Sequence, residues 1–424
     1  MKILMFGWEF PPHITGGLGT ACYGLTKGLM NNQQEVIFVV PKAYGDESKD
    51  IRLLSASDVN LDMRNTAFSE YWTHLKYIEI DSILVPYADD EEFYRITRNK
   101  EHHTAENESV FSKNFKFSGK YGNSLMEEVK RYALIAAQVA SEQEHDIIHA
   151  HDWLTYEAGI SAKAVSGKPL VVHMHATEFD RSGEHVNQTV YDIELRGMQA
   201  ADRVITVSNL TRNIVIERYG IDPAKVFTVH NAVEYSDISG YHNVERHVKE
   251  KVVTFLGRIT FQKGPEYFVE AAAKILKRDK NVRFVMAGSG DMLNKMIKRV
   301  AQLKIATKFH FTGFLKGEEV DHMFALSDVY VMPSVSEPFG ISPLEAMRSN
   351  VPVIISKQSG VSEVLHHAIK VDFWDIDALA DSIWGLTHYD GLSKMFVSLG
   401  KTEVDNMKWD NAAAKVIDVY NTLN

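Results

Sequence analysis

A chain of 424 residues exceeds what one hydrophobic core usually supports, so the length predicts two domains. Its 45% hydrophobic and 24% charged residues are typical of a globular protein, and exclude a disordered or fibrous one. The net charge of −10 is concentrated in residues 1–245, which contain 23 Lys and Arg and 35 Asp and Glu. Residues 246–424 contain 23 Lys and Arg and 21 Asp and Glu. Because nucleic acids and anionic lipids bind basic patches, we predict no nucleic-acid partner and expect no membrane association.

The opening of the chain does not resemble a signal peptide. Its sequence, MKILMFGWEF, has one Lys and a short apolar run that Gly7 and Glu9 interrupt, and no apolar stretch of the chain reaches membrane-spanning length. The single cysteine, Cys22, excludes an internal disulfide and lies in a predicted helix, where a small buried side chain is expected. These features predict a cytoplasmic protein.

Apolar runs of strand length alternate with helix-length segments along nearly the whole chain. The runs are continuous rather than alternating with polar residues, which is typical of parallel strands buried on both faces. The pattern therefore predicts an α/β fold of doubly wound, Rossmann-like sheets. The expected strands are 2–6, 36–40, 147–150, 170–174, 204–207 and 226–229, then 252–256, 282–287, 329–332 and 352–355.

A polar segment without periodicity, residues 235–250, separates the two series of strands. A final amphipathic helix is expected over 402–422, and the charge-rich residues 86–124 are interpreted as an insertion of a kind that is often functional or mobile. The predicted parts are an N-terminal Rossmann-like domain, a C-terminal Rossmann-like domain and a C-terminal helical segment: 1–240, 241–400 and 401–424.

The first candidate site is the glycine loop TGGLG, after the first strand and before a helix expected to begin near Thr20. Gly16 and Gly17 let the backbone approach a ligand closely and expose N–H groups beside a helix N-terminus, as a diphosphate requires. The spacing fits neither a Rossmann G-x-G-x-x-G nor a Walker loop. A plain tight turn remains the alternative.

Two further candidates follow the strands 147–150 and 170–174, where ligands of open α/β sheets bind. Asp152, in HAHDW, could hold sugar hydroxyls, or it could cap the helix that follows. His175, in VVHMHATEFDR, is interpreted as a hydrogen-bonding group for a sugar hydroxyl or the backbone. The four histidines on these strands also suggest zinc, but H-x-H spacing without a cysteine nearby argues against it.

The second half of the chain carries two candidate motifs. In GRITFQKG, Arg258 and Lys263 stand on a short loop before a helix, where both can neutralise a diphosphate leaving group, although solvated surface charges would look the same. In EPFGISPLE, Glu337 and Glu345 lie eight positions apart across a strand–turn–helix junction. An ordinary αβ unit is the alternative there. The DID motif at Asp375–Asp377 is assigned to helix capping, with Asp377 as the cap, so no catalytic metal is predicted.

Taken in order, the glycine loop, HAHDW, the histidine after the strand, R-x4-K and E-x7-E resemble the retaining glycosyltransferases of the GT-B fold, including glycogen and starch synthases. The resemblance covers nearly the whole chain. It implies two Rossmann-like domains facing a central cleft, with the N-terminal one on the acceptor side, the C-terminal one binding the nucleotide sugar, and the C-terminal helix crossing back to the first domain. It also implies a nucleotide diphosphate sugar as co-substrate and no other cofactor.

The resemblance also assigns roles. Arg258 and Lys263 match the pair that binds the donor diphosphate, and Gly16 and Gly17 the loop that faces it. Glu337 matches the glutamate that contacts the donor sugar, with the backbone N–H groups of three neighbours nearby, and Glu345 the one that holds the ribose. His175 matches a histidine beside the sugar 6-hydroxyl and anomeric carbon, and Asp152 an aspartate of the same site. The neighbours of Glu337 whose backbone N–H groups lie near the donor sugar in the family are Phe339, Gly340 and Ile341.

The expected activity is transfer of glucose from UDP-, ADP- or GDP-glucose to the non-reducing end of an α-1,4-glucan, with retention at the anomeric carbon. One departure concerns Ile14, where bacterial glycogen synthases usually have Lys, and it leaves ADP-glucose as donor open. The alternatives are another acceptor (a small sugar, a lipid-linked saccharide or a cell-surface polysaccharide), a nucleotide-sugar epimerase of the same fold, and a sugar-binding protein without turnover.

Overall fold

The computed structural model describes residues 1–13, 16–48, 50–59, 115–119, 122, 124–234 and 248–423. Ile14, most of the expected insertion at 86–124, and residues 235–247 of the expected domain junction lie outside the described residues. The chain forms two compact units. Unit 1 comprises Met1–Asn231 and Trp409–Asn424, and unit 2 comprises Ala232–Lys408.

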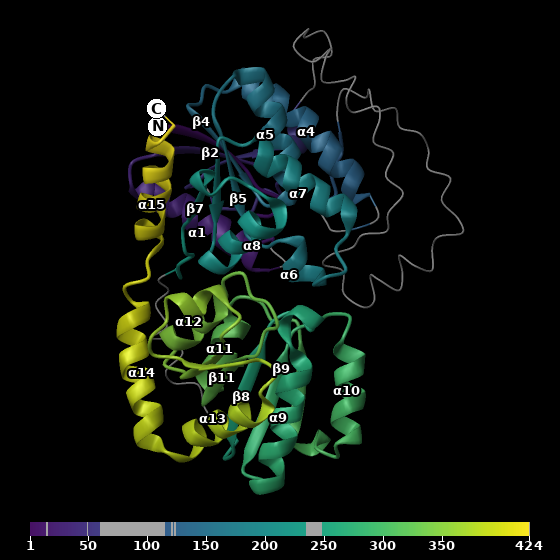
Figure 1. Ribbon diagram of the computed structural model, residues 1–424, viewed down its shortest axis with the longest axis vertical. Helices are drawn as coiled ribbons and strands as arrows, with labels where there is room; N and C mark the ends of the chain where they lie inside the picture. The colour runs from purple at the N-terminus through teal and green to yellow at the C-terminus, as the bar shows by residue number, and fades with distance from the viewer. Residues whose placement is uncertain are drawn as a thin grey trace, which may run out of the picture. The chain divides into compact units, whose positions relative to one another are not determined.

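Unit 1 is built on a parallel sheet that has seven strands in the described part of the chain, in the order β3-β2-β1-β4-β5-β6-β7. Helices α4, α5 and α7 lie on one side of this sheet and α15 on the other, next to α1 (Figure 1). The strands are β1 (Lys2–Phe6), β2 (Glu35–Val40), β3 (Arg52–Ser55), β4 (Ile147–His151), β5 (Leu170–Met174), β6 (Arg203–Thr206) and β7 (Val226–Thr228). The helices are α1 (Gly17–Asn31), α4 (Leu125–Glu142), α5 (Trp153–Ser166), α6 (Glu178–Ser182), α7 (Gln188–Ala200), α8 (Asn209–Tyr219) and α15 (Trp409–Asn421).

Unit 2 repeats this architecture with a parallel sheet in the order β10-β9-β8-β11-β12-β13. Helix α9 packs against α13, and α12 against α14. The strands are β8 (Lys251–Leu256), β9 (Val282–Ala287), β10 (Phe309–Gly313), β11 (Val329–Met332), β12 (Val353–Ser356) and β13 (Ile369–Val371). The helices are α9 (Pro265–Arg278), α10 (Leu293–Gln302), α11 (Glu318–Leu326), α12 (Ser342–Arg348), α13 (Ile376–His388) and α14 (Asp390–Val404), with a short 3₁₀ turn, η6 (Phe261–Lys263), before α9.

Both cores follow from the continuous apolar runs. In β1, Ile3 through Phe6 are all fully buried, because helices cover both faces of the sheet. The two sheets therefore confirm the predicted doubly wound α/β class. In the described part of the chain, no helix is both long and apolar enough to span a membrane.

The expected final helix over 402–422 is wrong in detail. Helix α14 ends at Val404 within unit 2, and α15 begins at Trp409 within unit 1. The chain leaves one unit for the other between these helices. Helix α15 reaches α1 at two glycines: a Cβ atom on Gly24 would lie 2.2 Å from the Trp409 indole nitrogen, and one on Gly28 would lie 2.5 Å from its carbonyl oxygen. These glycines let the two helices approach closely.

Candidate functional site

The glycine loop opens helix α1 earlier than expected. The helix begins at Gly17 rather than near Thr20, and Gly16 is its N-cap in an extended conformation. Both glycines are exposed, and a Cβ atom on either would meet nothing within 4 Å. Neither the fold of unit 1 nor backbone strain therefore requires glycine at these positions. An approaching ligand remains a reason for their small size, as the diphosphate prediction supposes.

Asp152 lies between β4 and α5 in a backbone conformation that side-chain-bearing residues rarely adopt, with φ 62° and ψ 167°. It occupies the N-cap position of α5, but its side chain makes no capping hydrogen bond. The carboxylate is buried, and its Oδ1 has no hydrogen-bond partner among the described residues. Capping therefore does not account for this aspartate, which favours the ligand-binding alternative.

Burial raises the pKa of Asp152 to about 6, although Arg181 and the backbone N–H groups of Trp153 and Ala176 favour the carboxylate. His175, one residue beyond β5, has a pKa that burial lowers to about 3. At neutral pH the site in unit 1 therefore presents a carboxylate and a neutral imidazole. A neutral imidazole can donate one hydrogen bond and accept another, as recognition of a hydroxyl group requires.

Behind His175 lie three more histidines in one stacked group. Ring centroids are 4.4 Å apart for His149 and His151 on β4, and 4.4 Å apart for His173 and His175 at the end of β5. His149 shares hydrogen bonds with Tyr420 of α15 and, at 3.3 Å, with His173. Burial and the neighbouring histidines keep the pKa values of the three inner imidazoles well below their usual range, so the group is uncharged. Tyr420 was not predicted, because nothing local in its sequence links it to β4.

In unit 2 the structure brings Lys263 and Glu337 into direct contact. Lys263 Nζ donates to Glu337 Oε2 at 2.5 Å, and the buried Ser334 hydroxyl donates to the same oxygen at 3.2 Å. The carboxylate is 8% exposed and the lysine 20%, so this is a partly desolvated ion pair. The predicted phosphate-binding cation and the predicted sugar-binding carboxylate thus form one group, to which Ser334 is an addition that sequence patterns did not reveal.

Arg258 follows β8 on the same loop, and its guanidinium donates to the Gln262 side chain at 3.5 Å. Gln262 is buried, and its backbone carbonyl accepts a hydrogen bond from the backbone N–H of Val335 at 2.8 Å. This bond joins the Arg258–Lys263 loop to the segment that leads into Glu337. Gln262 was also missed, because a glutamine in a loop carries no pattern of its own.

The turn after Glu337 depends on Gly340, whose φ is 101°. A Cβ atom there would lie 3.0 Å from the Met332 methyl carbon and 3.2 Å from Glu337 Cγ. Ile341 then takes the N-cap position of α12, and Phe339 is buried, its carbonyl accepting the Val361 N–H at 2.7 Å. The turn therefore fixes the backbone from Glu337 into α12.

Glu345 lies in the first turn of α12, apart from the Lys263–Glu337 pair. Burial raises the pKa of Glu345; the nearby Asp321 carboxylate raises it further, and the Arg348 guanidinium lowers it. The start of α12 is tied to β8 by Tyr330, whose hydroxyl contacts Ser342 Oγ at 2.8 Å and donates to the Leu256 carbonyl at 3.2 Å. The two glutamates of E-x7-E thus occupy different surroundings, as their different assigned roles require.

The DID motif is a helix start, but the predicted cap was wrong by two residues. Asp375, not Asp377, is the N-cap of α13, and its side chain accepts the Ala378 N–H at 2.9 Å. Asp377 lies in the first turn and pairs with Lys274. An aspartate in the first turn interacts favourably with the helix dipole even when it is not the cap. The sequence alone therefore does not show which of the two aspartates is the N-cap.

Gly264 positions Lys263, and replacing it tests this arrangement. Its φ is 64°, and a Cβ atom would lie 2.1 Å from the Pro333 carbonyl oxygen. We expect Gly264→Ala to separate the loop from the Glu337 segment and reduce catalytic turnover at least tenfold. Gly167→Ala is the matched control, because Gly167 has φ 67° with nothing within 4 Å of its Cβ position. It should cost only about 1–2 kcal/mol of stability. Equal losses of turnover in the two variants would contradict the positioning role.

Comparisons with known proteins show the family of this chain. Residues 2–227, just over half of the chain, match the family described as starch synthase catalytic domain, and residues 240–401 match glycosyl transferases group 1. The chain belongs to the glycogen- and starch-synthase-like glycosyltransferases. The predicted GT-B family and hexosyltransferase activity are thereby confirmed.

Three relatives of this glycosyltransferase each cover 70% or more of its chain. A protein of Methanocaldococcus jannaschii described as an uncharacterized glycosyltransferase is 28% identical over 99% of this chain and 98% of its own. The glycogen synthase of Mycobacterium tuberculosis is 22% identical over 86% of this chain and 80% of its own. An Escherichia coli galactosyltransferase, which transfers from UDP-Gal to alpha-D-GlcNAc-diphosphoundecaprenol, is 25% identical over 70% and 80%.

Two solved structures share the GT-B fold of this glycosyltransferase. Sucrose-phosphate synthase of Thermosynechococcus elongatus has a TM-score of 0.70 at 16% identity, covering 100% of this chain and 98% of that one. HepE of Anabaena, in complex with UDP and glucose, has a TM-score of 0.66 at 17% identity, covering 100% of both chains. At these identities the likeness concerns the fold alone.

Proposed function

We propose that this glycosyltransferase transfers glucose from a nucleotide diphosphate glucose to the non-reducing end of an α-1,4-glucan, with retention. The observation that carries the acceptor is the match of residues 2–227 to the starch synthase catalytic domain. The similarity of this chain to a glycogen synthase, and the UDP and glucose bound by HepE, support a nucleotide diphosphate glucose as donor. Arg258 and Lys263 supply the cationic charge that a diphosphate leaving group needs.

In the proposed reaction the bond between the anomeric carbon and the diphosphate oxygen breaks, and the bonding electrons leave with the nucleotide. Arg258 and Lys263 stabilise the charge that develops on this leaving group. The acceptor hydroxyl forms the new C–O bond on the same face, and its proton passes to the departing phosphate oxygen. Glu337 holds sugar hydroxyls and need not act as a nucleophile, unlike the carboxylate pair of a retaining glycosidase. We further propose that this chemistry requires no metal ion.

A donor-by-acceptor matrix tests this function. UDP-, ADP- and GDP-glucose are each combined with glycogen, maltooligosaccharides, monosaccharides and a polyprenyl-diphosphate saccharide, and nucleotide release is measured. We expect release to depend on glycogen or maltooligosaccharide with at least one donor. Release that depends only on the lipid-linked acceptor would favour the second candidate, for which the E. coli galactosyltransferase is the supporting relative. Release without any acceptor would favour an epimerase.

The pKa of Asp152 gives the reaction a predicted pH dependence. Because this pKa is about 6 and the carboxylate is the form that accepts hydroxyl hydrogen bonds, kcat/KM should rise as the pH increases through about 6. Asp152→Asn should remove this inflection, and His175 should add none above pH 5, since its pKa is about 3. The measurement is a profile of kcat/KM from pH 5 to pH 9. An inflection near pH 6 that persists in Asp152→Asn would show that another group titrates there. Glu345→Gln is the comparison variant, because burial also raises the pKa of Glu345.

A further inference from the structure

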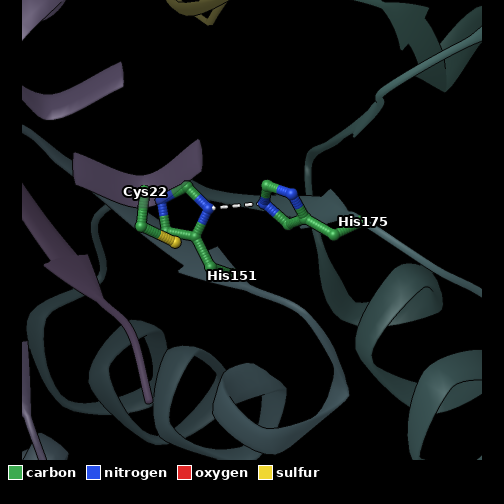
Figure 2. A group of neighbouring side chains, drawn as sticks. All are labelled: Cys22, His151 and His175. Carbon is green, nitrogen blue, oxygen red and sulfur yellow. Dashed lines mark hydrogen bonds between the residues drawn. The ribbon is translucent and has the colours of Figure 1, made fainter. Parts of the chain in front are cut away.

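Three side chains with ligand atoms suited to a soft metal ion meet in unit 1. Cys22 comes from α1, His151 from the end of β4, and His175 from the residue after β5. The Cys22 sulfur and one ring nitrogen of each histidine all lie within 4.8 Å of one another. Figure 2 shows the His151 ring between Cys22 and His175, with its Nδ1 directed at the His175 ring. The cysteine that the sequence did not connect to the histidines is therefore beside them.

The two histidine nitrogens are nearly as far apart as in a tetrahedral zinc site. Zinc bonds of about 2.3 Å to sulfur and about 2.0–2.1 Å to nitrogen place the ligand atoms of one ion roughly 3.3–3.6 Å apart. His151 Nδ1 and His175 Nε2 are 2.9 Å apart. They would separate by a few tenths of an ångström to admit an ion. Rotation of the partly exposed His175 ring can supply this, since His151 is fully buried.

The chemistry of the three groups also suits a cation. Imidazole nitrogen and cysteine sulfur are ligands that zinc prefers. The carboxylates of Glu9 and Asp152 lie near enough to the Cys22 thiol to interact with it, and they add negative charge around the site. The same negative charges attract a dication, which can displace the thiol proton as it binds.

His151 has one ring nitrogen without a hydrogen-bond partner among the described residues. It is fully buried, and its Nε2 has no hydrogen-bond partner among the described residues. A second group of histidines, His149, His151 and His173, is also close enough to hold an ion. All three of its rings are buried, and both nitrogens of His149 are engaged, by Tyr420 and by His173. The partly exposed His175 gives the Cys22 group a route for an incoming ion.

We propose that Cys22, His151 and His175 form a binding site for Zn²⁺ or a similar thiophilic divalent cation, and that the bound ion inhibits transfer. The fourth coordination position would be open to water on the side of His175, as in zinc sites with three protein ligands. Inhibition follows because the ion takes the His175 lone pair from the sugar. This second part rests on the proposed function, whereas metal binding does not.

Cobalt spectroscopy tests the binding directly. Co²⁺ is added to the full chain, and the thiolate-to-cobalt charge-transfer absorption is followed. We expect one Co²⁺ per chain with this absorption, displaced by Zn²⁺. Cys22→Ala should abolish the absorption, and His175→Ala should weaken binding at least tenfold while the protein remains folded by circular dichroism. His13→Ala is the control for the exposed group of His13, Asp46 and Glu47, and it should bind Co²⁺ as the wild type does. Absence of the band in the wild type, or Co²⁺ affinity that Cys22→Ala leaves unchanged, would overturn the site.

Inhibition is then measured with Zn²⁺ and the donor and acceptor identified by nucleotide release. Half-inhibition of wild-type transfer should require at least tenfold less Zn²⁺ than that of Cys22→Ala, whose activity without Zn²⁺ should match the wild type, and a chelator should restore activity. Equal sensitivity of the two proteins would overturn the inhibitory role. If cobalt binds through Cys22 but no donor and acceptor react, the metal site stands and the proposed function fails.

Discussion

Lys263→Ala is expected to reduce kcat about 10²- to 10³-fold, the usual loss when one preorganised group that stabilises transition-state charge is removed. The substitution also leaves the Glu337 carboxylate without the cation that contacts it at 2.5 Å. We infer that the ion pair keeps both charges compensated until the donor binds, when Lys263 turns to the diphosphate and Glu337 to the sugar hydroxyls. The measurement is kcat and KM for the donor, with thermal denaturation to establish folding.

Lys274→Ala is the matched control for this prediction. Lys274 lies on α9, in the same unit, and pairs with the exposed Asp377. Its side chain is 41% exposed, so we expect kcat within twofold of the wild type. Should Lys263→Ala retain more than a tenth of the wild-type kcat, Lys263 would not be the group that stabilises the leaving diphosphate.

Arg181→Ala is expected to destabilise unit 1 strongly, because its guanidinium is the partner of two buried carboxyl groups. Arg181 forms ion pairs with Glu178, at 3.1 Å, and with the fully buried Glu194, which also contacts the Tyr219 hydroxyl. Removing the cation leaves Glu178 buried without a compensating charge and Glu194 without one of its hydrogen-bond donors, which costs about 3–5 kcal/mol. For a unit of this size that corresponds to a fall in Tm of roughly 6–20 °C.

A surface arginine provides the comparison. Arg218 pairs with Glu184, but its side chain is 47% exposed, so Arg218→Ala should lower Tm by less than about 3 °C. Similar shifts in the two variants would show that the buried cluster does not depend on Arg181. Scanning calorimetry is the suitable measurement.

The same cluster has a pH dependence of definite sign. One guanidinium serves two carboxylates, and burial raises the pKa of Glu194 to about 8, above its ordinary 4.5. The folded state therefore holds this proton more tightly than the unfolded state does. Its contribution to stability is fully present below about pH 4.5 and is lost as the pH rises through about 8. Glu194→Gln should flatten the fall in Tm between pH 6 and pH 9.

Most of the strands that were predicted correctly, such as β1 and β4, are buried on both faces and so produce a continuous apolar run; the edge strand β7 is an exception. The strands that were missed, β3, β10 and β13, lie at the edges of their sheets and are partly exposed. Each has a single neighbouring strand and so needs fewer apolar residues. The missed strands therefore lack a distinctive composition, and pairing with the neighbouring strand is what makes them part of the sheet.

The candidate sites divide in the same way. Motifs within one short stretch of chain, such as R-x4-K and E-x7-E, could be proposed from the sequence because their residues lie close together along the chain. Contacts between distant segments could not: Cys22 with His151, and Ser334 with the Lys263–Glu337 pair, depend on the order of strands in each sheet. The spacing of Gly24 and Gly28, one helical turn apart, was a signal that could have indicated the close approach of α15 to α1.

The most direct test of the central claim is transfer of labelled glucose from UDP-, ADP- or GDP-glucose into glycogen, followed by digestion with β-amylase. This digestion releases maltose from α-1,4-linked non-reducing ends, so one measurement reports donor, acceptor and anomeric outcome. Retaining transfer to a glucan predicts labelled maltose from at least one donor, and its loss in Lys263→Ala. Glycogen that stays unlabelled with all three donors, or label that β-amylase cannot release as maltose, would contradict the account.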